Sequence, residues 1–244
     1  MKLSVCIPMY NERAVIADTA KQLADALDAR FAGDYELIFS DDGSTDGSAD
    51  CVRALELPCV RVVGYPENRG KGCAVRTAML AANGEIALFT DADLAYGTDV
   101  IVQAVELFSE HPERAVIVGS RNLEKDGYIG YTFWRRVASK AYIRVLCMVG
   151  GLKLSDSQCG FKAFRKDAAQ AIFSRCRTNG FAFDLEAILW AQALDFKVSE
   201  MPVRVLVHRD SKIRLVRDAF RMFRNVIGIR RDVAKRSRAE KTSR

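Results

Sequence analysis

Short apolar segments alternate with amphipathic segments through the first half of the chain, and this alternation limits what the chain can fold into. The predicted strands cover residues 3–8, 35–40, 59–64, 85–90 and 115–120. The predicted helices cover residues 12–32 and 99–109, a segment that ends near residue 55, and a segment that runs through residue 82. Because the connections are short, the pattern favours an α/β fold with a doubly wound, mostly parallel sheet.

The pattern changes after Ser120. A polar loop at 121–127 leads through several aromatic residues into a basic helix that contains Arg135, Arg136, Lys140 and Arg144. We then expect a turn at 156–162 that enters a short strand, a helix at 181–194, and a last strand or pair of short strands within 197–207. The predicted organisation is one α/β domain, residues 1–210, followed by a basic tail, residues 211–244.

Polar clusters follow three of the predicted strands, at residues 10–12, at residues 41–42 and at Asp91 and Asp93. In a doubly wound sheet, ligands bind at the carboxyl ends of the strands. Side chains two residues apart on an extended backbone point the same way, so we expect the carboxylates of Asp91 and Asp93 to converge. Such a pair suits a hard cation shared with substrate phosphates. A solvated turn or a helix cap is the alternative for Asp-x-Asp alone, but the three clusters together favour a nucleotide-and-metal site.

A glycine loop at residues 67–72 opens the helix that runs through residue 82. It lacks the GxxxxGK[ST] spacing of a P-loop. A glycine-lined helix N-terminus can nevertheless hold an anion, so Lys71 is a candidate donor-binding residue. A plain strand-to-helix turn explains the glycines equally well, and both interpretations stay open here.

The positive charge of the chain is concentrated in its C-terminal segment. Lys and Arg outnumber Asp and Glu by 14 to 4 in residues 204–244, whereas the rest of the chain is slightly acidic. Residues 211–233 have the pattern of an amphipathic helix, with Val216, Phe220, Phe223 and Ile227 on one face and Arg214, Arg217, Arg221 and Arg224 on a flank. This helix either packs on the core with a solvated basic face or lies on anionic lipid. Specific nucleic-acid binding is disfavoured, because no aromatic residues are interleaved for base stacking.

The cysteines and the hydropathy of the chain indicate the cellular compartment in which we expect it. The seven cysteines include no Cys-x-x-Cys pair, and their odd number is typical of a reducing compartment. No apolar run approaches the length of a bilayer span, and the first residues run directly into a strand without a signal-peptide pattern. We therefore expect a cytoplasmic protein without a membrane-spanning segment.

Several motifs together resemble those of family 2 glycosyltransferases. Residues 7–12, 41–46, 68–72 and 90–93 occur in the order typical of that family. Downstream, residues 119–121, 156–162, 180–186 and 211–212 are more similar to the polyprenyl-phosphate branch, especially the dolichyl-phosphate glucosyltransferases. The resemblance implies a GT-A (Rossmann-like) fold, a nucleotide-diphosphate sugar donor, and Mg²⁺ or Mn²⁺ as cofactor.

The resemblance also implies roles for individual residues. The nucleoside pocket would be lined by Pro8, Tyr10, Glu12 and Asp41. Asp91 and Asp93 would face the diphosphate, with Asp93 the more direct metal ligand. Arg121 would contact a donor or acceptor phosphate, and Arg135 and Ser139 would lie at the acceptor. Ser211 and Lys212 would close over the diphosphate. Ala95 departs from the family pattern, because many relatives have a polar residue there; water would then replace one metal ligand. The eukaryotic relatives have an N-terminal membrane anchor, which we do not expect here, so we expect the tail to dock on the membrane.

The function implied is inverting transfer of a hexose, from UDP-glucose, to a polyprenyl phosphate by a peripheral protein on the inner face of the membrane. A phosphate acceptor needs no general base, whereas a sugar hydroxyl, as in cell-envelope glycan synthesis, would need one, and Asp184 is the candidate. A sugar-phosphate nucleotidyltransferase is a further alternative, but the glycine-rich N-terminal signature of such enzymes is missing. The last alternative is a basic adaptor without enzymatic activity.

Overall fold

The computed structural model describes residues 1–125, 127–128, 132–206 and 215–242, with only the backbone described at residue 135 and at residues 215–224. The strands in this part of the chain are β1 (Leu3–Met9), β2 (Tyr35–Asp42), β3 (Val60–Tyr65), β4 (Ile86–Phe89), β5 (Val116–Ser120), β6 (Lys162–Arg165) and β7 (Val198–Pro202). The helices are α1 (Ile16–Phe31), α2 (Ser48–Arg53), α3 (Lys71–Ala81), α4 (Asp99–Glu110), α5 (Phe133–Gly150), α6 (Lys166–Phe173), α7 (Phe183–Ala193) and α8 (Leu215–Thr242).

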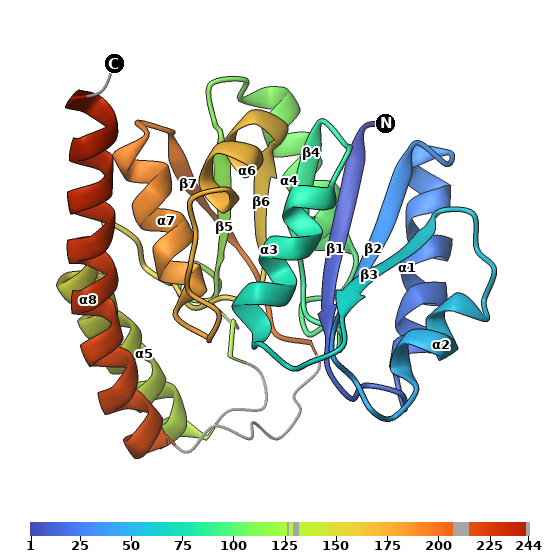
Figure 1. Cartoon of the computed structure of the whole chain (residues 1–244), viewed down its shortest axis with the longest axis horizontal. Coiled ribbons are helices and arrows are strands. Elements are labelled where there is room, and N and C mark those ends of the chain that lie inside the picture. The colour runs from blue at the N-terminus through green and yellow to red at the C-terminus, as the bar shows by residue number, and fades with distance from the viewer. Residues whose placement is uncertain (126, 129–131, 207–214, 243–244) are drawn as a thin grey trace.

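The strands form one sheet in the order β3-β2-β1-β4-β6-β5-β7, and its carboxyl edge lies at the bottom in Figure 1. The pairs β1–β2, β2–β3, β1–β4 and β5–β7 are parallel, which confirms the predicted fold class. β6 alone is antiparallel to both of its neighbours, and its first residue, Lys162, pairs with Phe89 at the end of β4. The chain therefore enters β6 from the carboxyl edge, and the turn before β6 lies at the same edge as Asp91.

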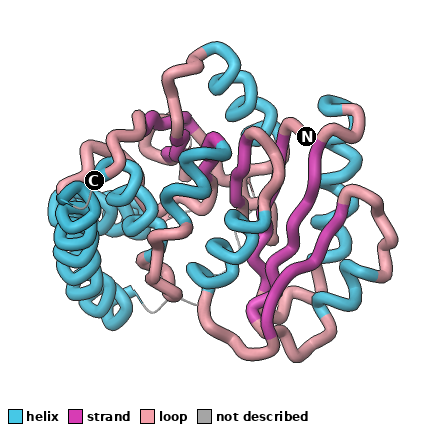
Figure 2. The backbone as a smooth tube through the Cα atoms, turned by 45° about the horizontal axis from the view of Figure 1, so that its top comes forward, coloured by secondary structure: helices cyan, strands magenta, loops and turns pink. Residues whose placement is uncertain are grey.

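Helices cover both faces of the sheet, and each face has its own apolar core (Figure 2). Because side chains of a strand alternate between the two faces, Val5 and Ile7 of β1 contribute to one core and Cys6 to the other. The first core contains residues of α1, α2 and α4, and the second contains residues of α3, α5, α6, α7 and α8. This arrangement places the polar edge of the sheet between two rigid layers.

α8 packs against α5 and α7 and extends past the predicted end at residue 233 (Figure 1). Its Val226 and Val233 side chains are buried in the second core, and the Arg236 guanidinium lies 4.9 Å from the ring centroid of Trp190. The core-packed interpretation therefore holds for residues 225–242. The predicted apolar and basic side chains at 214–224, including Phe220 and Phe223, lie outside the described side chains.

The described residues include no helix with both the length and the hydropathy needed to cross a bilayer. All seven cysteines are free thiols, and five of them are buried. They behave as small apolar residues within the two cores.

We predict that alanine in place of Gly72, in the first turn of α3, destabilises the protein. A Cβ at this position would lie 2.5 Å from Thr178 O and 2.7 Å from Phe183 Cβ. We expect Gly72→Ala to lower the free energy of unfolding by about 1–3 kcal/mol through overpacking, measured by urea titration. Gly228→Ala in α8 is the matched control, since its Cβ would meet nothing within 4 Å, and it should raise stability by up to about 1 kcal/mol. Equal effects of the two substitutions would contradict the steric explanation.

Candidate active site

β4 ends at Phe89, earlier than predicted, and the two aspartates lie in a turn. The Leu94 N–H donates to Asp91 O at 3.1 Å, and Leu94 has a φ of 48°. The expectation that an extended backbone aims Asp91 and Asp93 at one point is therefore wrong. The turn places the two carboxylates one after the other beyond the strand and gives each its own partners.

The Asp91 carboxylate forms an ion pair with the Lys71 ammonium and packs against Gly160. Any Cβ at Gly160 would collide with the Asp91 carboxylate, so this glycine provides the space in which Asp91 lies. Asp93 Oδ1 accepts the Ala95 N–H at 3.1 Å. Asp91 is thus held toward α3, whereas Asp93 is held toward its own turn.

Lys71 carries a proton under all ordinary conditions. Burial on its own would lower its pKa, but neighbouring carboxylates raise the pKa above its usual value, and these are Asp91, Asp184 and Asp93 in order of influence. The side chain therefore contributes a fixed positive charge among three acids at the carboxyl edge of the sheet.

The two aspartates fit a hard divalent cation that is shared with a substrate. Within the described part of the chain, no group of three or more His, Cys, Asp or Glu residues could hold a metal ion. Mg²⁺ commonly uses one or two carboxylates and takes its other oxygen ligands from water and substrate phosphates. Asp91 is paired with Lys71, and the assignment of Asp93 as the more direct metal ligand stays a prediction from the family resemblance.

The glycine loop is organised by hydrogen bonds within the protein. The buried Asp42 carboxylate accepts the Arg69 N–H at 2.8 Å and the Gly70 N–H at 2.9 Å, and Tyr65 Oη donates to it at 2.6 Å. At the start of α3, the Gly72 N–H donates to Asn179 O at 2.7 Å. These backbone groups are engaged within the protein, so the structure supports the strand-to-helix turn for the glycines. The Lys71 side chain reaches the site through its ion pair with Asp91.

The residues predicted for the nucleoside pocket lie together at the ends of β1 and β2. The two strands are parallel neighbours, and Met9 is in register with Asp41, which places Pro8, Tyr10 and Asp41 at adjacent strand ends. Tyr10 is exposed, as an aromatic ring that stacks on a ligand would be. Glu12 follows Tyr10, and its N–H donates to Ser48 Oγ at 2.9 Å.

Asp184 is a buried partner of Lys162. Lys162 Nζ lies 2.6 Å from Asp184 Oδ1 and donates to Cys159 O at 2.7 Å, and the lysine is fully buried. Burial raises the pKa of Asp184 above its usual value, although Lys162 and Lys71 oppose the rise. To act as a general base, Asp184 would have to release the Lys162 ammonium into an apolar environment.

Arg121 is buried in a forked ion pair with Asp156. Its Nε and Nη2 donate to the two Asp156 carboxylate oxygens at 2.7 and 3.1 Å. Burial on its own would lower the pKa of Arg121, but Asp156 raises it well above the usual value. The geometry fixes the guanidinium plane beside the ring of Tyr128, 5.4 Å from its centroid.

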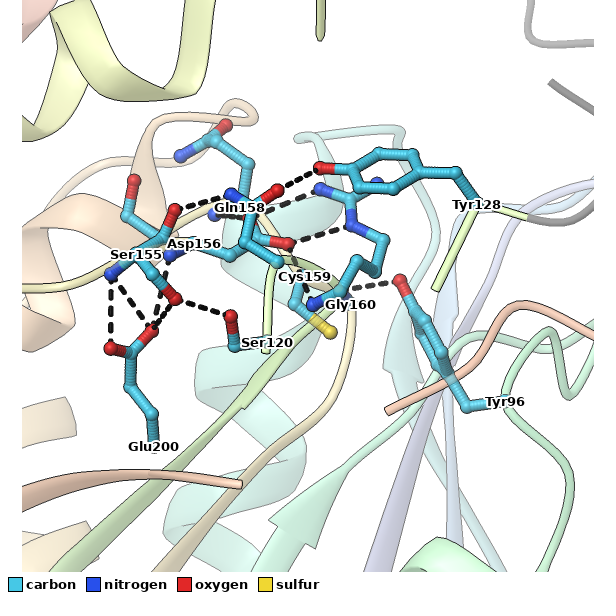
Figure 3. Close-up of polar contacts among 12 residues, drawn as sticks. Tyr96, Ser120, Tyr128, Ser155, Asp156, Gln158, Cys159, Gly160 and Glu200 are labelled. Atoms are coloured by element: carbon cyan, nitrogen blue, oxygen red, sulfur yellow. Dashed lines mark hydrogen bonds and ion pairs between the residues drawn. The ribbon is translucent and has the colours of Figure 1, made fainter. Parts of the chain in front are cut away.

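The turn that carries Asp156 is itself fixed by Glu200 of β7 (Figure 3). The Glu200 carboxylate accepts the Ser155 N–H at 2.9 Å, the Ser155 hydroxyl at 2.7 Å and the Asp156 N–H at 3.1 Å. At the other end of the turn, the Gly160 N–H donates to Tyr96 Oη at 3.2 Å. Glu200 was not predicted from the sequence, because a single acid within a short strand has no local pattern to distinguish it.

Three cationic side chains lie near the ring of Tyr128. Arg121, Lys140 and Arg136 lie 5.4, 5.5 and 5.8 Å from its centroid. Lys140 and Arg136 come from the first turns of α5, the helix that also carries the predicted acceptor residues Arg135 and Ser139. The side chain of Arg135, together with Ser211 and Lys212, lies outside the described residues. From the sequence, Arg136 and Lys140 were predicted only as part of a basic helix.

The buried pair of Lys162 and Asp184 gives a stability prediction. Lys162→Met and Asp184→Asn each leave a buried charge without its counter-charge, and each should lower the free energy of unfolding by about 3–5 kcal/mol. The double variant should be more stable than the sum of the two losses implies, since no unpaired charge remains. Urea unfolding of the four proteins measures this coupling, and strictly additive losses would contradict the assignment of an ion pair.

Comparison with known proteins identifies relatives along most of the chain. The family model described as Glycosyl transferase family 2 matches residues 4–173. The chain is 32% identical over 217 residues to a dolichyl-phosphate beta-glucosyltransferase of Drosophila melanogaster, covering 84% of this chain and 67% of that protein. It is 31% identical over 228 residues to a protein of the same name from Mus musculus, covering 87% and 69%. The chain thus spans about two thirds of the length of these relatives.

Solved structures show the same fold. The glucosyl-3-phosphoglycerate synthase of Mycobacterium tuberculosis, crystallised with Mn²⁺, UDP and glucosyl-3-phosphoglycerate, matches with a TM-score of 0.67 at 21% identity, covering 93% of this chain and 78% of that one. The same enzyme with Mn²⁺, UDP-glucose and phosphoglyceric acid matches with a TM-score of 0.66 at 21% identity, over the same shares of both chains. The predicted GT-A fold is confirmed, and with the family match over residues 4–173 the chain belongs to glycosyltransferase family 2.

Proposed function

We propose that this glycosyltransferase moves glucose from UDP-glucose to the phosphate of a polyprenyl phosphate, with inversion at the anomeric carbon. The observation that carries the proposal is the pair of α5 cations, Arg136 and Lys140, beside the ring of Tyr128. The Asp156-paired Arg121 lies by the same ring, at the edge of the sheet where Asp91 and Asp93 lie. Cations held by an aromatic ring suit a phosphate acceptor, because guanidinium and ammonium groups bind phosphate by charge and by hydrogen bonds.

The comparisons support the two substrates separately. The relatives from fly and mouse are named for transfer of glucose to dolichyl phosphate, which is a polyprenyl phosphate. The structural neighbour is an enzyme crystallised with UDP-glucose and Mn²⁺, which supports UDP-glucose as donor and Mg²⁺ or Mn²⁺ as cofactor. Membership of a glycosyltransferase family argues against the alternative of a sugar-phosphate nucleotidyltransferase.

The donor would lie across the ends of β1, β2 and β4. Pro8, Tyr10, Glu12 and Asp41 would surround the nucleoside, and the diphosphate would extend toward Asp93. A divalent cation held there by Asp93, with Asp91 beside it, supplies positive charge that stabilises the leaving nucleoside diphosphate. Lys71 adds its fixed charge on the same side, and Lys212, outside the described residues, would close over the diphosphate.

The reaction is a single displacement. An oxygen of the acceptor phosphate forms a bond to the anomeric carbon of glucose while the bond from that carbon to the UDP oxygen breaks, and its electron pair leaves on the β-phosphate. Attack from the opposite face converts the α-linked donor into a β-linked product. The acceptor phosphate is already an anion near neutral pH, so no general base is required and the ion pair between Lys162 and Asp184 can stay intact.

We also propose that the protein works at the inner face of the membrane as a peripheral, cytoplasmic enzyme. A polyprenyl chain is insoluble in water, so the enzyme has to meet its acceptor at a lipid surface. The net positive charge of residues 204–244 supports attraction to anionic lipid. The part of α8 that packs on the core through Val226 and Val233 is not free to insert into lipid.

Asp93→Ala tests the metal assignment. Loss of the candidate ligand should reduce the turnover number about a thousandfold or more, because charge on the leaving group is no longer neutralised. UDP release from UDP-glucose and polyprenyl phosphate is the measurement, and Asp50→Ala, at an exposed aspartate of α2, is the matched control. Full activity of Asp93→Ala, or of the wild type in a chelating buffer, would contradict the proposal.

Arg136→Ala and Lys140→Ala test the acceptor assignment. Each variant should raise the KM for polyprenyl phosphate about tenfold through loss of one phosphate contact, and leave the Kd for UDP-glucose unchanged. Arg135→Ala should behave in the same way. Arg231→Ala, at an exposed arginine of α8, is the control. If the α5 variants are silent while Asp184→Asn remains folded and loses transfer, a hydroxyl acceptor with Asp184 as base becomes the better interpretation.

A further inference from the structure

α5 presents a continuous apolar stripe to solvent, in addition to the face that it buries. Ile143, Leu146 and Cys147 are buried in the second core. On a different side of the helix, Trp134, Val137, Val145 and Met148 are exposed, with Trp134 78% and Met148 61% accessible. At about 100° per residue, these four side chains lie within an arc of about 80°.

The size and composition of this stripe need an explanation. Phe133, 69% accessible, packs edge-on against Trp134 at a centroid distance of 5.4 Å, so the stripe begins with two large exposed aromatic rings. Single exposed apolar residues are normal in proteins, but a contiguous exposed patch indicates a binding surface. We call the stripe formed by Phe133, Trp134, Val137, Val145 and Met148 the α5 outer face.

The charge around the α5 outer face identifies its partner. α5 contains Arg135, Arg136, Lys140 and Arg144 and no acidic residue. By helical position, Lys140 and Arg144 lie between the buried Cys147 and the exposed Val137, whereas Arg136 lies on the buried side. Cations on the flank of an exposed apolar face are typical of a helix that rests in an anionic lipid interface. α8 packs beside α5, and its part with described side chains, residues 225–242, has six basic and two acidic residues.

The position of α5 suits a role in acceptor capture. Figure 1 shows α5 and α8 side by side, both reaching below the carboxyl ends of the strands. The aromatic start of α5 is the end from which Arg136 and Lys140 face the ring of Tyr128. A lipid surface in contact with Phe133 and Trp134 would therefore lie next to the cations proposed to bind the acceptor phosphate.

We propose that the α5 outer face inserts into the headgroup region of an anionic phospholipid membrane and so brings the cations around Tyr128 to the level of a lipid-linked phosphate. The choice of a lipid surface as partner rests on the proposed function. The basic segments of α5 and α8 attract the protein to the surface, and the aromatic and aliphatic side chains of the outer face hold it there.

The two tryptophans of the chain provide a direct measurement. Trp134 is in the outer face, whereas Trp190 is fully buried in the second core. When the full chain is mixed with vesicles of equal parts phosphatidylglycerol and phosphatidylcholine, the Trp134 emission should shift to shorter wavelength and become protected from an aqueous quencher. Trp134→Phe should abolish this change, because the remaining emission comes from Trp190.

Substitutions in the middle and end of α5 test whether the stripe itself binds. Val145→Glu and Met148→Glu should each weaken partitioning to these vesicles about tenfold, equivalent to about 1.4 kcal/mol. Leu80→Glu, at an exposed apolar residue of α3, is the matched control and should have no effect. Thermal unfolding of all variants should match the wild type, since each replaced side chain is exposed.

Transfer to a short, water-soluble polyprenyl phosphate without vesicles separates this inference from the proposed function. Insertion of Trp134 without any such transfer would contradict the function and leave the membrane contact standing. Unchanged Trp134 emission with vesicles, alongside normal transfer, would overturn the inference. The inference is also overturned if Val145→Glu and Met148→Glu leave vesicle binding intact, because docking would then belong to the tail alone. It is likewise overturned if sedimentation shows a dimer that the same variants dissociate, because the outer face would then bind a second copy of the chain.

Discussion

Charged side chains at the carboxyl edge of the sheet are paired, and three ion pairs, two of them buried, connect the loops of the site. The pairs are Lys71–Asp91, Lys162–Asp184 and Arg121–Asp156. Each joins segments that are far apart in the sequence, so the pairs hold α3 to the turn after β4, β6 to α7, and the end of β5 to the turn before β6. Because an uncompensated buried charge costs several kcal/mol, the two buried pairs, Lys162–Asp184 and Arg121–Asp156, stabilise the arrangement of the segments that they join.

The same pairs set the electrostatic character of the site. Lys71 and Arg121 stay protonated, since carboxylates raise their pKa values above the usual range against the effect of burial. Burial, and after it Cys159, raises the pKa of Tyr96 well above its usual value, whereas Arg121 acts in the opposite direction. An anionic donor and an anionic acceptor would thus meet fixed cations, which do not need to reorganise when charge moves during transfer.

The fold could be predicted from the sequence, because strand and helix periodicities are local. Residues such as Val5 and Cys6 show directly in their spacing that β1 has an apolar side chain for each face of the sheet. The candidate site was predicted only in part. Asp91, Asp93 and Asp41 were found because they follow strands, whereas Glu200 and Lys162 act through partners from other elements, and no local pattern records such contacts. The antiparallel direction of β6 was not predicted either, because the two-residue alternation of side chains in a strand does not indicate the direction of the strand.

The chemistry of the acceptor explains why a buried Asp184 is compatible with the activity. A hydroxyl acceptor must lose a proton as it attacks, so its enzyme needs a carboxylate that is free to accept that proton. Asp184 lies 2.6 Å from the fully buried Lys162 ammonium, and removing its charge by protonation would leave that ammonium unpaired. A phosphate acceptor is already ionised when it binds, so the enzyme needs cations to hold it and does not need a base. The cations around Tyr128, two of them on a helix with no acidic residue, meet that demand.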